Sequence, residues 1–364
     1  MAHPFGAEMA YRGCDTSPSV SRISVVVISK NEDFLSETLQ ALEAQCAASA
    51  AECVVVDASG GGLSQIRDAN PWVRWHDFRG PDGRSVTIPH QRNLGVSIAT
   101  GDVIAFCDAG GVPENGWLSR LTSPILDGSA AATGGPIRSR YRSSYGTMND
   151  VPTGAPLPMV VTSNFAFARE LFDRIGGFDE RFDYGSDTDF GWRIEEAGEN
   201  VVSVRDAVMS IDWGDRRRQL RRDLRYGEAK VRQWLWRRDR RRRIVEESPE
   251  ILVYPLLFLT TPLAILAAVV TRRWLVVGPW IGAYAIVVLR DVWFGRRIDS
   301  MLDHFMVTFG ICKELASAAA RRRTGGRLDA HVEAAPRGSA APRGESHGSQ
   351  GPEQRYQGDP TGRR

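Results

Sequence analysis

Runs of hydrophobic residues divide the first third of the chain into short, regularly spaced segments. Residues 23–28 (ISVVVI) form a continuous β-branched run, which is typical of a strand buried in a parallel sheet. Apolar runs at 54–56 and 103–107 have the same character, and residues 72–78 form a further candidate. The pattern therefore predicts four strands in this part of the chain.

Helices are predicted between these strands. Leu35, Leu39 and Leu42 recur at helical spacing, and Asn31 precedes them at a position where its side chain is expected to cap the helix. Residues 91–99 show the same periodicity and predict another helix. Strands and helices that alternate with short connections build a mainly parallel sheet covered on both faces. The expected fold class is therefore an α/β, Rossmann-like sheet.

Two aspartates directly follow predicted strands. Asp57 ends the strand at 54–56, and Asp108 ends the strand at 103–107. Ligands of such sheets bind beyond the carboxyl ends of the strands, although an aspartate at a strand end also serves in ordinary turns. A dinucleotide-binding dehydrogenase would need a glycine-rich turn after the first strand, and residues 29–32 (SKNE) contain no glycine. That class of enzyme is not expected.

A less regular region, rich in Pro and Gly, covers residues 134–212. Its clearest element is a predicted helix at 187–197, which Gly198 terminates. Asp187 and Asp189 lie in the first turn of that helix, where a carboxylate either caps the helix or is available for chemistry. Both readings stay open on the residues alone.

The second half of the chain holds two long uncharged stretches. Residues 251–270 are long enough to cross a hydrocarbon core of roughly 30 Å as a helix. Residues 274–289 are shorter and interrupted by Gly278-Pro279, so this stretch spans thinly, extends through Arg290, or re-enters the membrane. The sequence predicts a C-terminal transmembrane hairpin.

Basic residues set the expected orientation of this hairpin. Arginines at 237–243 precede it and Arg296-Arg297 follow it, which places both flanks in the cytosol by the positive-inside rule. Arg272 and Arg273, in the loop between the two stretches, count against this placement with fewer charges. We expect a multi-pass protein of the cell membrane whose α/β domain lies on the cytoplasmic face.

The net charge of +2 conceals a strongly basic segment. Residues 215–243 hold thirteen arginines and one lysine against four acids, interleaved with aromatic and aliphatic residues. Beside a membrane segment, such a helix is expected to lie on anionic lipids, although a solvated basic helix has the same composition. Nucleic acid is the alternative polyanion, but the adjoining hydrophobic stretch favours lipid, so no nucleic-acid partner is expected.

The cysteines and the chain ends add further limits. The five cysteines show no C-x-x-C spacing, which argues against a zinc site or a disulfide framework and favours a reducing compartment. No apolar stretch follows the start methionine, so no secretory signal is expected.

The predicted parts are a disordered leader at 1–21, an α/β domain at 22–214, a basic membrane-surface helix region at 215–250, a transmembrane hairpin at 251–293, a membrane-proximal helix at 294–320 and a disordered tail at 321–364.

Five segments, each a weak pattern alone, carry a family resemblance through their order. They are VVVISKNE (25–32), VVVDAS (54–59), QRNLGVSIATGDVIAFCDAG (91–110), SNFAFARELFDRIGGFDERF (163–182) and YGSDTDFGWRIEEAG (184–198). Together they resemble a family 2 glycosyltransferase with a GT-A fold, over roughly residues 23–229. The resemblance implies an enzyme of the hexosyltransferase type.

The resemblance also implies roles for individual residues in an inverting transfer, in which a nucleoside diphosphate leaves the sugar as an acceptor hydroxyl attacks it. Asp187 matches the family's catalytic base, and Asp189 is the nearby alternative, expected otherwise to bind substrate. Asp57 matches the aspartate that contacts the nucleotide. Arg92 and Asn93 match residues that orient the sugar or diphosphate, or else anchor their helix to the sheet.

A divalent cation is implied by the family's D-x-D motif, whose first aspartate matches Asp108. Here the motif reads Asp108-Ala109-Gly110, so the second carboxylate is missing. The histidine that the family often has after the base segment is also missing, and Asp212 is the oxygen ligand available near that position. Asp108 and Asp212 are the expected ligands of Mg²⁺ or Mn²⁺, with metal dependence left open.

Two hypotheses follow. The first is a membrane-bound transferase that moves a sugar from a nucleotide-sugar donor to a lipid-linked or glycan acceptor of the cell envelope, as in polysaccharide biosynthesis. The second is a non-catalytic nucleotide-sugar-binding subunit of the same fold, which the missing carboxylate at Gly110 motivates. The presence of Asp187 favours the enzyme.

Overall fold

The structure is a computed structural model that describes residues 22–80, 86–140, 147–293 and 300–323. All of these residues belong to one unit of the chain. The predicted leader and most of the predicted tail lie outside the described residues.

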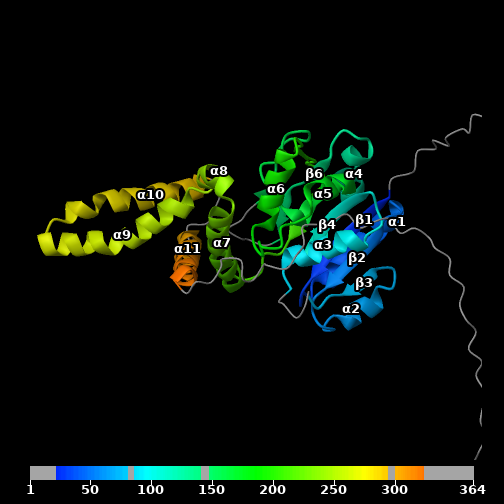
Figure 1. The fold of residues 1–364 in the computed structure, drawn as a ribbon, viewed down its shortest axis with the longest axis horizontal. Helices are drawn as coiled ribbons and strands as arrows, with labels where there is room; N and C mark the ends of the chain where they lie inside the picture. The colour runs from blue at the N-terminus through cyan, green and yellow to red at the C-terminus, as the bar shows by residue number, and fades with distance from the viewer. Residues whose placement is uncertain (1–21, 81–85, 141–146, 294–299, 324–364) are drawn as a thin grey trace, which may run out of the picture. The chain divides into compact units, whose positions relative to one another are not determined.

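A seven-stranded sheet forms the centre of the α/β domain (Figure 1). Its strand order is β10-β6-β9-β4-β1-β2-β3, and every neighbouring pair is parallel except the two that involve β9. The strands are β1 (Ile23–Ser29), β2 (Glu52–Asp57), β3 (Arg74–Asp77), β4 (Val103–Asp108), β6 (Ala132–Gly134), β9 (Phe165–Ala168) and β10 (Val201–Ser203). The four predicted strands are confirmed, with β3 shorter than predicted.

Helices bury both faces of this sheet. They are α1 (Leu35–Ala48), α2 (Ser64–Ala69), α3 (Ile88–Ile98), α4 (Trp117–Leu126), α5 (Arg169–Ile175) and α6 (Ser186–Glu196). Val25 and Val27 of β1 belong to the core formed with α1 and α4, whereas Val26 and Ile28 belong to the core formed with α3, α5 and α6. Successive residues of a strand face opposite sides, so a sheet covered on both faces requires the uninterrupted apolar run seen in the sequence.

Two helix starts differ from the predictions. Asn31 does not cap α1, because Phe34 is the N-cap residue and Asn31 lies in the left-handed region with a φ of 55°. The Asn31 amide instead donates to Ser59 Oγ at 2.7 Å, so this residue belongs to the loop after β1. Helix α3 begins earlier than predicted, because the Thr87 side chain caps it.

A second sheet, ordered β5-β11-β7-β8, occupies part of the region with the irregular sequence. Its strands are β5 (Gly111–Pro113), β7 (Ile137–Ser139), β8 (Thr147–Met148) and β11 (Met209–Ile211), and a 3₁₀ turn, η2 (Thr162–Asn164), precedes β9. Ile211 pairs with Gly111, which follows β4 closely in the chain. This pairing brings Asp212 near the end of β4.

Among the described residues that follow the α/β domain, there are five helices and two 3₁₀ turns. They are α7 (Arg216–Trp236), η3 (Arg238–Arg240), α8 (Arg241–Glu247), α9 (Glu250–Thr271), η4 (Trp274–Val277), α10 (Gly278–Trp293) and α11 (Ser300–Arg323). Helices α7 and α11 cross very closely: a Cβ added at Gly310 would lie 2.0 Å from the Leu224 carbonyl oxygen, and one at Gly227 would lie 2.1 Å from that of Val307. The predicted helix at 294–320 thus corresponds to α11, which packs on α7, while residues 294–299 lie outside the described ranges.

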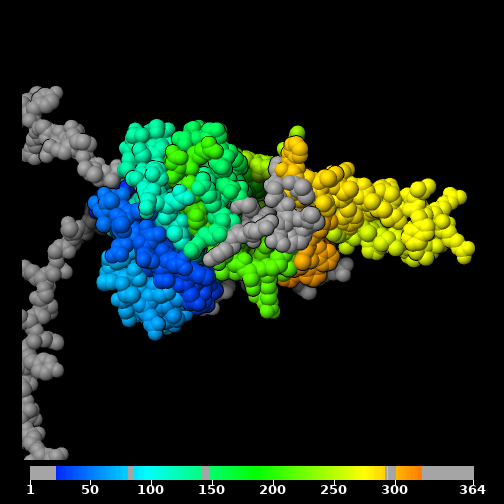
Figure 2. Space-filling model, turned by 180° about the vertical axis from the view of Figure 1, so that it is seen from behind, coloured from blue at the N-terminus to red at the C-terminus, as the bar shows by residue number. Residues whose placement is uncertain are grey.

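Helices α9 and α10 lie side by side (Figure 1). Trp280 Nε1 donates to Thr260 Oγ1 at 2.9 Å, and the hydroxyls of Thr261 and Tyr284 are 2.9 Å apart. Many of their large apolar side chains are exposed, and Figure 2 shows this yellow segment largely uncovered on the face in view. By length and composition, residues 250–271 and 274–291 can each cross a membrane.

Candidate active site

The strands β1, β2 and β4 end at one edge of the main sheet. Ile28 pairs with Asp108 across β1 and β4, and Ser29 pairs with Asp57 across β1 and β2. Asp108 is followed by a tight turn in which Gly110 has a φ of 90°. A side chain is strained at this φ, so the turn itself favours glycine where a D-x-D motif has its second aspartate.

Arg92, on the neighbouring helix α3, contacts Asp108. Its Nη2 lies 3.2 Å from Oδ1 and 3.3 Å from Oδ2 of Asp108. The Arg92 side chain is only 5% exposed and lies over the Phe178 ring, whereas the Asp108 side chain is 38% exposed. Gln91 fixes this part of α3, because its Nε2 donates to carbonyl oxygens at the ends of β1 and β2, both at 2.9 Å. A rigidly held guanidinium therefore lies beside a carboxylate that stays accessible.

Asp187 lies in the first turn of α6 and lines the same cavity as Arg92 and Asp108. Gly185 is the N-cap residue of α6, in the left-handed region with a φ of 81°, and no side chain caps the helix. Neither Asp187 nor Asp189 is the N-cap residue of α6, although Asp187 Oδ1 accepts the Thr188 amide of the first turn at 2.9 Å. Burial raises the pKa of the Asp187 carboxyl above its ordinary value, although the charge of Arg92 acts in the opposite direction. A carboxylate with a raised pKa accepts a proton more readily.

A cavity of about 640 Å³ surrounds these residues. Among the described residues, its lining carries the carboxylates of Glu32, Asp108, Asp183, Asp187, Asp212, Asp223, Glu250 and Asp303, and the cationic side chains of Arg92, Arg218, Arg222, Lys230 and Arg290. Eight carboxylates against five cations make this lining acidic. A ligand that carries phosphate charges needs additional positive charge to enter such a site.

Asp212 lines the cavity directly after β11. Its Oδ1 accepts a hydrogen bond from the Gly214 amide at 2.8 Å. Within the described parts of the chain, no three or more His, Cys, Asp or Glu side chains converge as a metal-binding group. A divalent cation that also binds substrate phosphates needs only one or two protein carboxylates. Asp108 and Asp212 could supply these two carboxylates.

Asp57 and Asn93 are not among the residues that line the cavity, and their contacts with the nucleotide and the sugar stay predictions. Asp57 is buried, and its Oδ1 accepts the Ser59 amide at 2.9 Å, as in an ordinary turn. The Asn93 side chain accepts the Phe178 amide and donates to the Phe178 carbonyl oxygen, both at 2.9 Å. Asn93 thus anchors the loop that leads toward α6.

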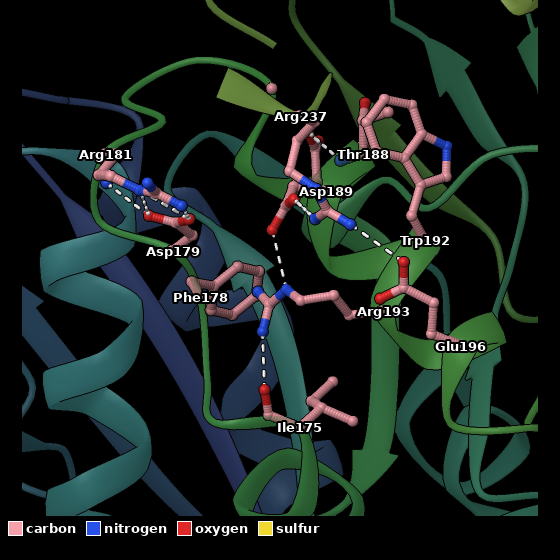
Figure 3. Close-up of polar contacts among 12 residues, drawn as sticks. Ile175, Phe178, Asp179, Arg181, Thr188, Asp189, Trp192, Arg193, Glu196 and Arg237 are labelled. Carbon is pink, nitrogen blue, oxygen red and sulfur yellow. Dashed lines mark hydrogen bonds and ion pairs between the residues drawn. The ribbon is translucent and has the colours of Figure 1, made fainter. Parts of the chain in front are cut away.

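Asp189 also lies outside the cavity lining, and its role as the alternative base or as a substrate ligand stays a prediction. Figure 3 shows its side chain between Arg193 and Arg237. Arg193 Nε lies 2.8 Å from Oδ2, and Arg237 contacts Oδ1. The Asp189 side chain is fully buried, and both of its oxygens are paired with cations.

The sequence interpretation missed the cavity face of α7. Arg218, Arg222 and Tyr226 recur every four residues on this helix, and all three line the cavity. This i, i+4 spacing was a signal that the basic segment has a face turned toward the α/β domain. Arg218 Nη2 contacts Glu32, from the loop after β1, at 2.5 Å.

Comparisons with known proteins agree with this architecture. Residues 24–178 match the model of glycosyl transferase family 2. The pre-mycofactocin glycosyltransferase of Mycobacterium tuberculosis is 29% identical over 145 residues, which cover 36% of this chain and 30% of that protein. Glycosyltransferase AglE of Haloferax volcanii is 22% identical over 171 residues, which cover 44% of this chain and 56% of that protein. The chain thus spans about a third to about half of the length of these relatives.

A solved structure has the same fold over most of the chain. The mannosyltransferase PcManGT from Pyrobaculum calidifontis, in complex with GDP-Man and Mn²⁺, superposes with a TM-score of 0.59 at 19% sequence identity, covering 82% of this chain and 88% of that one. The resemblance and the GT-A fold predicted from the sequence are confirmed. Residues 24–178 thus form a glycosyl transferase family 2 segment within this chain.

Proposed function

We propose that this chain is an inverting hexosyltransferase that moves a sugar from a nucleotide-sugar donor to an acceptor hydroxyl. The observation that carries the proposal is the convergence of Asp187, Asp108 and Arg92 in one cavity at the carboxyl ends of a parallel sheet. These residues supply a base, an anchor for the donor side and a fixed cation. Displacement of a nucleoside diphosphate needs all three.

Asp187 is the proposed base. Its carboxylate accepts the proton of the acceptor hydroxyl as the acceptor oxygen bonds to the anomeric carbon and the bond from that carbon to the diphosphate oxygen breaks. Attack opposite the leaving group inverts the anomeric configuration. The Thr188 amide donates to Asp187 Oδ1 at 2.9 Å and so orients the carboxylate. The raised pKa that burial gives this carboxyl supports its role in taking up a proton.

Asp108 and Asp212 are the residues that would hold a divalent cation together with the donor phosphates. A bound Mg²⁺ or Mn²⁺ would supply positive charge to the departing diphosphate. The acidic lining of the cavity supports this requirement, since five cationic side chains do not balance eight carboxylates even before a diphosphate enters. Arg92 contributes a fixed guanidinium on the side of Asp108.

The proposed acceptor is membrane-associated, either a lipid-linked molecule or a glycan of the cell envelope. The cavity extends from Asp187 to Tyr254 in α9 and Arg290 in α10, the helices that can cross a membrane. Exposed apolar side chains on α9 support membrane insertion, among them Leu256 at 68% and Leu263 at 64%. An acceptor at the level of the lipid headgroups would reach the cavity from this side.

The catalytic domain is proposed to lie on the cytoplasmic face, with the hairpin crossing the membrane twice. The arginines at 237–243 favour this orientation. Anionic lipids remain proposed partners for the exposed Arg217 and Arg221 of α7. An impermeant maleimide tests the orientation in a background without other reactive cysteines: it should label Arg272→Cys from outside intact cells and Arg242→Cys only after lysis.

A non-catalytic nucleotide-sugar-binding subunit remains the second candidate. The observation that favours it is Gly110, which leaves Asp108 without the second carboxylate of the D-x-D motif. This candidate predicts donor binding without turnover.

The test of the proposed function is a transfer assay on the detergent-purified full chain. GDP- and UDP-sugars are offered with lipid and glycan acceptors, with Mn²⁺, with Mg²⁺ or with EDTA, and the anomeric configuration of the product is read by NMR. We expect metal-dependent release of nucleoside diphosphate and an inverted product. A retained configuration would overturn the inverting mechanism, and donor binding without turnover across the panel would favour the non-catalytic subunit.

A further inference from the structure

The buried carboxylate of Asp189 links two distant parts of the chain. It lies two residues after Asp187 in α6 and pairs with Arg193 of the same helix and with Arg237, which immediately follows α7 (Figure 3). Arg193 alone already supplies the positive charge that a buried carboxylate requires. The second arginine therefore has a role beyond neutralising Asp189, and it joins α6 to the segment that leads into α9.

Contacts between this segment and α6 extend along the whole helix. At the start of α6, Gln233 Nε2 donates to the Gly185 carbonyl oxygen at 3.0 Å. Near its end, Arg237 Nη2 lies 3.0 Å from Glu196 Oε1, and Arg240 contacts the same carboxylate. Residues 233–247, here called the α6 clamp, thus hold the helix that carries Asp187 at both of its ends.

The middle of α6 is held by an aromatic contact. The guanidinium groups of Arg240 and Arg243 lie 5.7 and 5.9 Å from the Trp192 ring centroid, and Trp192 Nε1 donates to Glu247 Oε2 at 3.2 Å. Arg243 also contacts Glu195. These contacts and the Asp189 pair add to the core packing of Phe190 and Ile194 in holding α6 against the rest of the chain.

We infer that Arg237 is a positioning residue, which acts through Asp189 to hold the carboxylate of Asp187 in place for catalysis. The inference rests on the proposed function of Asp187 as base. Arg237 does not line the cavity. Any effect of Arg237 on the reaction therefore passes through its contacts with α6. The α6 clamp is followed closely in the chain by α9, one of the helices that can cross a membrane.

The test compares Arg237→Ala and Arg237→Lys with the wild-type full chain. Arg238→Ala is the matched control, because Arg238 is the next arginine in the chain and is exposed. We expect Arg237→Ala to lower kcat by about 10- to 100-fold through misplacement of the base. The donor KM should stay within about threefold of wild type, because Arg237 does not touch the donor. Arg237→Lys, which keeps the charge but cannot contact Asp189 and Glu196 through two separate nitrogens, should recover part of kcat.

Hydrogen–deuterium exchange of the amides at 186–196 provides a readout that needs no turnover. These amides should exchange faster in Arg237→Ala than in wild type and should be unchanged in Arg238→Ala. Unchanged exchange and unchanged kcat in Arg237→Ala would overturn the inference. A parallel loss of kcat and donor affinity that Arg237→Lys does not relieve would also overturn it, as a general folding defect. If the wild type transfers no sugar, the proposed function fails, while the exchange data still decide whether Arg237 holds α6.

Discussion

The guanidinium of Arg92 contacts both carboxylate oxygens of Asp108 through a single nitrogen, Nη2. Arg92 comes from α3 and Asp108 from the end of β4, so the contact joins a helix to the edge of the sheet where ligands bind. Arg92 is buried while Asp108 is partly exposed, an arrangement that preorganises a positive charge beside an open carboxylate. We interpret the pair as the fixed part of the donor site.

Replacing Arg92 therefore tests the donor site. Arg92→Ala is expected to lower kcat/KM by roughly 100-fold or more, because it removes a fixed cation next to the departing diphosphate. Arg92→Lys should recover only part of the loss, since a lysine keeps the charge without the planar fork. Initial rates with the preferred donor measure both effects. Wild-type kcat/KM in a folded Arg92→Ala protein would contradict this role.

The turn at Gly110 gives a second prediction. Gly110→Asp restores the sequence of a D-x-D motif, but the φ of 90° is unfavourable for any side chain. We expect Gly110→Asp and Gly110→Ala to lose similar stability, roughly 1–2 kcal/mol, because backbone strain is common to both. Thermal unfolding and Mn²⁺ titration of the two variants check this. A Gly110→Asp protein that binds Mn²⁺ much more tightly at no cost in stability would show that the turn accepts a second carboxylate.

The raised pKa of Asp187 predicts the acid limb of the activity profile. A base must be deprotonated, so activity falls as the pH drops through its pKa. Burial raises that pKa, so the limb should lie above the ordinary aspartate value of 3.8. The profile of kcat/KM against pH in the wild type measures it. An acid limb at or below the ordinary pKa of an aspartate would contradict the raised pKa of Asp187.

The same shift makes a prediction about stability. A carboxyl whose pKa is raised on folding stabilises the folded state below its unfolded pKa, and this contribution is lost as the pH rises through the folded pKa. At neutral pH, Asp187 therefore costs stability that Asp187→Asn recovers. The thermal midpoint of Asp187→Asn should exceed that of wild type at pH 7, with a difference that shrinks toward pH 4. A difference that is independent of pH would argue against a titrating Asp187.

The crossing of α7 and α11 gives a prediction about packing. Gly310→Ala puts a Cβ about 2.0 Å from the Leu224 carbonyl oxygen, so the helices must separate. We expect a cost of roughly 1–3 kcal/mol, seen as a lower thermal midpoint in detergent. Gly282→Ala in α10 is the control, because its Cβ would meet no atom within 4 Å. Equal midpoints for the two variants would contradict the close crossing.

Local sequence patterns predicted the main sheet because each strand carries its own signal. The run at 23–28 is apolar on both faces, and the structure buries both faces of β1. Asp108 at the end of β4 followed from the same local pattern, Asp187 was assigned through the family resemblance, and both line the cavity. Features that depend only on one strand or one motif could be predicted from the sequence.

Features that depend on residues far apart in the chain could not be predicted from the sequence. Asp187 and Asp189 share the first turn of one helix, and no local pattern says which of them faces the cavity. The partner that Asp189 has in Arg237, 48 positions along the chain, is such a feature. The cavity face of α7 likewise depends on its packing, which the excess of arginine in that segment concealed. The partner of Asn93, the backbone of Phe178, is also remote in sequence.

The central claim is that Asp187 is the base of a sugar transfer, and its most direct test is turnover by Asp187→Asn beside wild type and Asp173→Asn. Asp173 is an exposed aspartate of α5 outside the cavity lining, so its variant controls for the loss of one carboxylate. We predict that Asp187→Asn binds donor as wild type does but releases nucleoside diphosphate at least about 100-fold more slowly, whereas Asp173→Asn is unchanged. Turnover by Asp187→Asn at the wild-type rate would contradict the account.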